Sequence, residues 1–217
     1  MIWMTGFTVI PLLMVFYYGL TDRSGAFTLA NILAISSSEH LKALWLSLAL
    51  AGVSTVICLV LAYPLALILR KRHIGKGSFV VFIFILPMWM NFLLRTMAWQ
   101  TLLEKNGVIN TFLTMLHLPN IAIINTPAAI ILGMVYNFLP FMVLPIYNTL
   151  AKIDDNVINA ARDLGADNYQ TLTKILLPLS IPGIVSGITM VFVPALTTFV
   201  ISNLLGGSKI LLIGNVI

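Results

Sequence analysis

The sequence predicts an all-α integral membrane protein that crosses the bilayer with about five helices. Hydrophobic residues make up 59% of its 217 residues and charged residues only 9%, whereas about a quarter of the residues in a soluble domain are charged. The apolar residues form long runs without the alternation that is typical of membrane β-strands. Because backbone in lipid must satisfy its own hydrogen bonds, we expect each run to be a helix.

Charged residues bound the first two runs. The run over residues 3–20 is followed by Asp22 and Arg23. It lacks the basic leader and the small-residue cleavage site of a signal peptide, so we expect it to be retained as a span. The run over residues 44–69 is followed by three basic residues at 70–72. Each run is long enough to cross a hydrocarbon core about 30 Å thick.

The remaining three runs contain internal prolines, such as Pro87 in the third and Pro140 in the fourth. Membrane helices tolerate proline where neighbouring groups satisfy the freed carbonyls, so we expect kinked helices. These runs cover residues 79–103, 127–150 and 181–205.

Basic residues predict the orientation of the chain, because cytoplasmic loops carry an excess of Lys and Arg. The loops over 70–78 and 151–180 together hold seven basic residues, against four on the other side. We therefore expect both loops and the N-terminus to be cytoplasmic. The same basic residues give no nucleic-acid signal, because they lie at the ends of membrane spans.

The predicted membrane spans lack acidic residues and histidines, the side chains that carry protons and bind metal ions in most sites. All seven acidic residues and all three histidines lie in loops or at the ends of the runs. This placement counts against proton- or sodium-coupled transport, a metal site and an enzyme with paired acids. Cys58 is the one cysteine, so we expect a buried small hydrophobe rather than a disulfide or a thiolate ligand. We predict no catalytic and no metal site.

One charge lies inside a run, at Arg95. The favoured interpretation is structural: the side chain snorkels outward or bonds carbonyls of neighbouring helices. The alternative is a charge that lines a transport pathway.

The loop over 151–180 carries the most information. Asp154 or Asp155 can cap a short helix that ends at Gly165. Asp167 and Gln170 have the spacing of a capping box for a second helix. Small alanines next to the glycine elbow would let another backbone approach closely. The two interpretations that remain open are a docking knob for a partner and a helix pair that packs on its own bundle.

This loop resembles the cytoplasmic motif of permease subunits of ATP-binding-cassette importers. The motif reads Glu-Ala-Ala, three positions, Gly, nine positions, Ile, one position, Leu-Pro, and this chain departs from it only at Asn159, where the motif has Glu. The resemblance implies a coupling helix that docks on the ATP-binding subunit. The predicted coupling residues are Asn159, Ala160, Ala161, Asp163, Gly165, Ile175, Leu177 and Pro178.

Further segments are similar to permeases of spermidine/putrescine importers, so that the resemblance covers nearly the whole chain. It implies a MetI-like type I importer permease, with residues 1–217 forming a single transmembrane domain. Such permeases have six spans, so we expect that the last helix is missing here. The similar segments are 61–64, 86–99, 139–147 and 204–217.

The resemblance also implies the partners. They are an ATP-binding subunit that holds ATP and Mg, a second permease subunit, an extracellular or periplasmic binding protein, and the lipid of the bacterial plasma (inner) membrane. The chain has no Gly-x-x-x-x-Gly-Lys-Ser/Thr loop, so we predict that it is not an enzyme and holds no cofactor. ATPase closure would push residues 155–178 and drive alternating access.

A polyamine is a flexible cation, which aromatic faces and amide carbonyls can bind through contacts of about 0.5–2 kcal/mol each. For each candidate, the alternative role is interfacial anchoring or helix packing. Other readings are a permease of the same fold for sulfate, iron or thiamine, a membrane-embedded enzyme, or a channel. The candidate pathway residues are Trp89, Asn91, Tyr136, Asn137 and Asn203.

Overall fold

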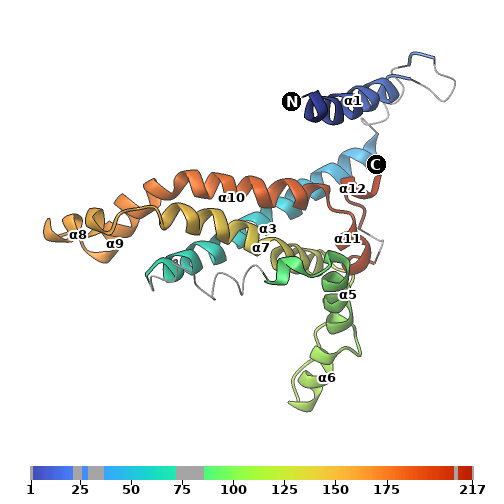
Figure 1. The fold of residues 1–217 in the computed structure, drawn as a ribbon. Coiled ribbons are helices and arrows are strands. Elements are labelled where there is room, and N and C mark those ends of the chain that lie inside the picture. The colour runs from blue at the N-terminus through green and yellow to red at the C-terminus, as the bar shows by residue number, and fades with distance from the viewer. Residues whose placement is uncertain (1, 22–25, 29–36, 72–85, 208–209, 217) are drawn as a thin grey trace.

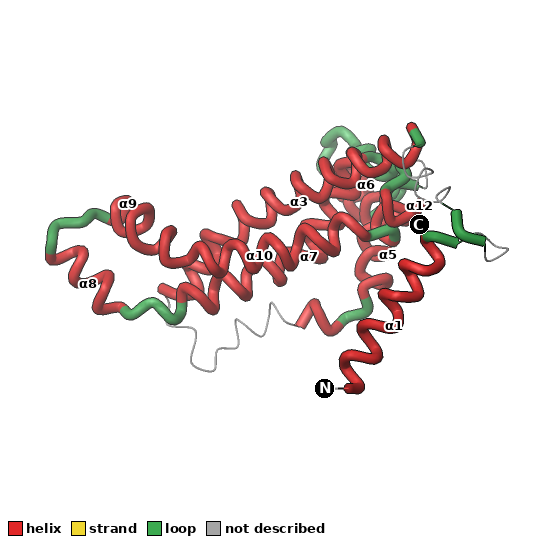
Figure 2. The backbone as a smooth tube through the Cα atoms, turned by 90° about the horizontal axis from the view of Figure 1, so that it is seen from above, coloured by secondary structure: helices red, strands yellow, loops and turns green. Residues whose placement is uncertain are grey.

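A computed structural model describes residues 2–21, 26–28, 37–71, 86–207 and 210–216 of the chain. Within these ranges the structure is helical and contains no β-strand, which confirms the predicted all-α class. Three long helices lie side by side at its centre (Figures 1 and 2). They are α3 (Ser38–Lys71), α7 (Pro127–Leu150) and α10 (Leu177–Thr197).

The central helices have the length and composition of membrane spans. The segments Ser38–Lys71, Pro127–Leu150 and Asn168–Thr197 are each apolar and long enough to cross a bilayer. Helix α7 coincides with the predicted run 127–150, and α3 extends beyond the run 44–69 at both ends.

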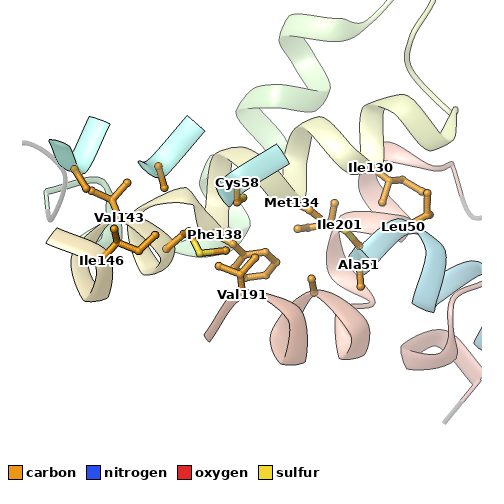
Figure 3. Packing of buried hydrophobic residues seen from close by; sticks show 14 of the residues in the cluster. Leu50, Ala51, Cys58, Ile130, Met134, Phe138, Val143, Ile146, Val191 and Ile201 are labelled. Atoms are coloured by element: carbon orange, nitrogen blue, oxygen red, sulfur yellow. The ribbon is translucent and has the colours of Figure 1, made fainter. Parts of the chain in front are cut away.

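Small residues let the central helices approach closely. Cys58, Ala62 and Ala66 recur every fourth residue on α3 and are fully buried against the core. Gly187 of α10 lies against Met142 of α7, whose sulfur would be 2.7 Å from a Cβ built on the glycine. Such small-residue spacing is typical of helix contacts in membranes. Figure 3 shows the larger side chains that fill the core around them, among them Met134, Phe138 and Val191 of α7 and α10.

Helix α1 (Ile2–Gly19) lies outside this bundle (Figure 1). Most of its large side chains are exposed, including Trp3 and Phe7, whose rings stack at 4.9 Å. Its apolar part, Thr5–Gly19, is shorter than the three central segments. That a span covers 3–20 therefore stays a prediction.

The third predicted run is interrupted. Residues 79–85 lie outside the described part of the chain, residues 86–89 are helical, and the chain then breaks at Met90 and Asn91. Helix α5 (Phe92–Leu103) begins there because the Asn91 side chain accepts a hydrogen bond from the Leu93 N–H at 2.8 Å. Twelve residues rise only about 18 Å, which is less than the hydrocarbon core.

The helix that corresponds to the fifth predicted run, 181–205, is shifted toward the N-terminus. It starts earlier, because α9 (Asn168–Thr171) continues through a π-helical turn, η1 (Leu172–Leu176), into α10. It also ends earlier, because Thr198 adopts an extended conformation and α11 (Val200–Leu205) follows. The remaining helices are α6 (Val108–Met115), α8 (Asp155–Asp163) and α12 (Ile213–Val216).

The bundle has two distinct ends. Helices α8 and α9 lie at one end, and α5, α11 and α12 lie at the other (Figures 1 and 2). The first end also holds the C-terminal residues of α3, because Arg70 bonds the last residue of α7. The loops that follow α3 and α7 therefore start on the same side of the bundle, as the orientation prediction requires.

Candidate functional site

Local hydrogen bonds define both ends of α8. The Asp154 side chain accepts from the Asn156 N–H at 2.9 Å, so Asp154 rather than Asp155 is the N-cap. At the other end Gly165 has a φ of +84°. The N–H groups of Gly165 and Ala166 donate to Arg162 and Ala161, which is the pattern of a Schellman motif. The predicted glycine elbow is present in the structure.

The second helix begins with the predicted capping box. The Asp167 carboxylate accepts from the Gln170 N–H at 2.6 Å, and the Gln170 side chain accepts from the Asp167 N–H at 3.3 Å. The prediction of a separate short helix was wrong, because the chain continues without a break into α10. Pro178 does not end this continuous helix.

The π-helical turn η1 lies just before Pro178 and accommodates it within the continuous helix. The Leu177 N–H donates to the Leu172 carbonyl, five residues earlier. Pro178 has no N–H to offer the carbonyl four residues before it, so an ordinary α-helical pattern cannot continue there. Of the motif residues in this part, Ile175 is half-buried, and Leu177 and Pro178 are exposed.

The elbow presents apolar side chains to the outside. Val157, Leu164 and Tyr169 are 44%, 89% and 73% exposed. Ala160 is exposed and Ala161 is half-buried, whereas Ile158 points inward and is buried. Helix α8 therefore packs on its own chain through the face that carries Ile158. The face that carries Ala160, which we call the alanine face, is left uncovered. This arrangement favours the docking interpretation over packing on the same bundle.

The other motif positions, Asn159 and Asp163, are exposed as well. A Cβ placed on Gly165 would meet no atom within 4 Å, so the surface around the elbow is open. Residues 159 to 165 thus lie on α8 and at the elbow that follows it, all exposed except the half-buried Ala161. Ile175, Leu177 and Pro178 lie beyond the elbow, in η1 and α10.

Sequence reasoning missed the role of Arg70 at this end of the bundle. The Arg70 side chain donates from Nε to the Leu150 carbonyl at 2.8 Å and from Nη2 to the Ile153 carbonyl at 2.9 Å. Nη2 also lies 3.0 Å from the Asp155 carboxylate. The sequence signal was the basic cluster at 70–72, which was used only to predict orientation.

The candidate pathway residues do not form one cluster in the described structure. Asn91 caps α5, and Trp89 just before it is 73% exposed. Tyr136 is 40% exposed and meets Trp99 edge to face at 5.3 Å. Asn203 accepts a hydrogen bond from Asn215 near the end of the chain. Their role in transport stays a prediction.

Asn137 is buried, with 1% exposure. Its Nδ2 donates to the Gly133 carbonyl at 2.9 Å and lies 3.5 Å from Thr96 Oγ1. Its Oδ1 has no hydrogen-bond partner among the described residues. In this conformation Asn137 bridges α7 and α5 and does not face an open path.

The structural interpretation of Arg95 needs correction. The side chain does not snorkel outward, since it is 6% exposed, and its Nε and Nη1 have no hydrogen-bond partner in the part of the chain that the structure describes. Helix α5, which carries Arg95, contacts α6, α7 and α11. Buried guanidinium nitrogens that lack partners, as these two do among the described residues, carry an uncompensated desolvation cost.

Comparison with known proteins places this architecture in a family. The model of the family described as binding-protein-dependent transport system inner membrane component matches residues 1–215. The chain belongs to this family. Its members are transport permeases of the inner membrane, so this chain is a multi-pass plasma-membrane permease rather than an enzyme.

Two relatives within the binding-protein-dependent permeases are similar over almost the whole chain. The spermidine/putrescine transport system permease protein PotB of Haemophilus influenzae is 38% identical over 224 residues, which cover 99% of this chain and 78% of that protein. PotB of Escherichia coli K12 is 40% identical over 223 residues, covering 99% and 81%. The inner membrane ABC transporter permease protein YdcU of the same strain is 33% identical over 193 residues, covering 82% and 62%.

Proposed function

We propose that this chain is a permease subunit of an ATP-driven polyamine importer, working by alternating access. Two observations support the cargo: relatives similar over 99% of the chain are named as spermidine/putrescine permeases, and aromatic and amide side chains suited to a cation occur just before α5 and on α7 and α11. The partners would be an ATP-binding subunit that holds ATP and Mg, a second permease and an external binding protein.

The single observation that carries the coupling role is the uncovered alanine face of α8. The face lies on the elbow that matches the importer motif, and Ala160 with Gly165 leaves room for another surface to come within van der Waals distance. A soluble domain seldom leaves such apolar side chains uncovered unless a partner binds there. Docking of an ATPase at this elbow would connect ATP hydrolysis with movement of the central helices.

The cargo would be held weakly by this subunit. Among the described residues, the buried polar set contains no carboxylate, and its one charged member is Arg95, which would repel a polycation. Selectivity would then reside mainly in the external binding protein, and the permease would provide a transit route.

Pull-down of the ATP-binding subunit together with uptake in vesicles tests this proposal. Gly165→Val forces a β-branched residue into a left-handed conformation at a cost of about 1 to 2 kcal/mol and adds bulk to the docking face. Ala160→Asp places a charge on that face without disturbing the interior, since Ala160 is exposed. Both variants should reach the membrane but lose ATPase recovery and uptake.

Ala122→Asp is the matched control. Ala122 is also exposed, but it lies in the segment that leads into the start of α7, whereas α8 follows the end of that helix. This variant should retain ATPase recovery. Full recovery and uptake in both elbow variants would refute the coupling role, and wild-type vesicles that accumulate no spermidine or putrescine in the complete complex would refute the cargo.

A further inference from the structure

Arg70 connects three segments of the chain at the end of the bundle where α8 lies. It is the penultimate residue of α3, and its side chain is 13% exposed. Its acceptors are the carbonyl of Leu150, the last residue of α7, the carbonyl of Ile153 in the following turn, and the carboxylate of Asp155, the first residue of α8.

The chemistry of these acceptors suits a guanidinium. The carbonyl of Leu150 already accepts from the Ile153 N–H at 3.2 Å, so Arg70 occupies its second lone pair. The planar fork of arginine can hold several acceptors at once in a fixed geometry, whereas lysine offers a single nitrogen. Asp155 is 59% exposed, so its ion pair is screened by water and the two carbonyl bonds hold most of the connection.

Without Arg70, the turn between α7 and α8 would be a natural hinge. Ala151 and Lys152 are exposed, and α8 has a single buried side chain, Ile158. A force applied to the alanine face of α8 would rotate the helix about this turn. With Arg70 in place, the turn that leads into α8 is bonded at Ile153 to the end of α3, which is bonded in turn to the end of α7 at Leu150, so the same force displaces these helices.

We propose that Arg70 is a positioning residue that transmits movement of α8 to α3 and α7, so that ATP hydrolysis and transport stay coupled. This inference rests on the proposed docking of an ATPase on α8. It predicts a particular defect: loss of Arg70 uncouples the transporter without detaching the ATPase, because the alanine face and Gly165 remain unchanged.

The test uses the complete importer in lipid vesicles, with binding protein and spermidine. Arg70→Gln should retain ATPase recovery within about twofold but lower the uptake per ATP hydrolysed at least fivefold. Arg70→Lys keeps the charge but not the fork, so it should lower this ratio about two- to threefold. Asp155→Asn should change it little. Lys71→Gln, the exposed neighbour, is the matched control and should behave like the wild type.

Spin labels at Ile68 of α3 and Arg162 of α8, both exposed, give a readout that a merely structural role would not change. The distance between the labels should be the same with and without ATP in the wild type, and it should broaden or shift with ATP in Arg70→Gln. Normal uptake per ATP in this variant, with an unchanged label distance, would overturn the inference.

Two further outcomes separate the inference from the proposal on which it rests. If Arg70→Gln does not accumulate in membranes, Arg70→Lys decides, and a wild-type ratio in that variant overturns the role of Arg70. Failure of the wild-type chain to recover any ATPase contradicts the proposed docking itself. Normal recovery by the wild type with fully coupled Arg70 variants contradicts only the transmission through Arg70.

Discussion

Gly183 of α10 lies directly against Thr149 of α7: a Cβ built on the glycine would be 2.5 Å from the Thr149 hydroxyl oxygen and 2.8 Å from the Pro145 carbonyl. That hydroxyl is itself fixed, because it donates to the same Pro145 carbonyl at 2.9 Å. The α7–α10 contact near the α8 end of the bundle therefore depends on the missing side chain.

Gly183→Ala should destabilise the protein, although alanine is the better helix former. Overpacking of this kind costs about 1–3 kcal/mol, and one of the clashing atoms is backbone. Gly52→Ala is the matched control: Gly52 also lies inside a span, but a Cβ there meets nothing within 4 Å, so the helix should gain about 0.5–1 kcal/mol. Thermal unfolding in detergent compares them, and equal melting temperatures would show that the contact can relax.

The parts of this structure that could be predicted from sequence depend on local chemistry. Asp154, Gly165 and the Asp167–Gln170 box each act within a few residues, so their spacing along the chain was sufficient. The all-α class followed from composition in the same direct way.

The parts that could not be predicted depend on distant partners. The role of Arg70 requires the end of α3 to lie beside the end of α7, about 80 residues later in the chain. The burial of Arg95 requires knowledge of which helices enclose it. The helix break at Asn91 did carry a local signal, since asparagine is a preferred N-cap, but the surrounding apolar run concealed it.

Asn91 offers a test between capping and cargo contact. Asn91→Ala removes the hydrogen bond to the Leu93 N–H and should cost about 1 kcal/mol of stability. Asn91→Asp and Asn91→Ser retain an acceptor and should restore the melting temperature. If Asn91 only caps α5, uptake should follow stability in all three variants. A change in the KM for uptake with a normal melting temperature would instead place Asn91 on the pathway.

The orientation of the bundle can be measured with introduced cysteines. The native Cys58 is fully buried, so background labelling should be low. Lys152→Cys and Asn168→Cys, both exposed at the α8 end, should resist a membrane-impermeant thiol reagent in intact cells, because basic loops stay in the cytoplasm. Ala122→Cys, in the segment that leads into the start of α7, should react. Reaction of the first pair in intact cells, with protection of the third, would invert the topology.

For Arg95, the structure and the sequence predict opposite effects of replacing the side chain on stability. A side chain that held helices together would make its removal harmful, which is what the sequence alone suggested. The structure instead shows a buried guanidinium whose Nε and Nη1 lack partners among the described residues, and replacing buried charged groups by apolar side chains of similar volume is often neutral or stabilising. Arg95→Met should therefore raise the melting temperature of the isolated chain.

Arg95→Ala serves as the comparison for that measurement. It also removes the charge but leaves space where the side chain packed, so it should be less stable than Arg95→Met. The melting temperatures of both variants, measured for the isolated chain and for the assembled transporter, show whether the Arg95 guanidinium is paired within the chain or by another subunit. If Arg95→Met lowers the melting temperature of the isolated chain, the guanidinium has a partner within the chain and the structural interpretation was correct. If it stabilises the isolated chain but weakens assembly, the free donors of Arg95 are satisfied by another subunit.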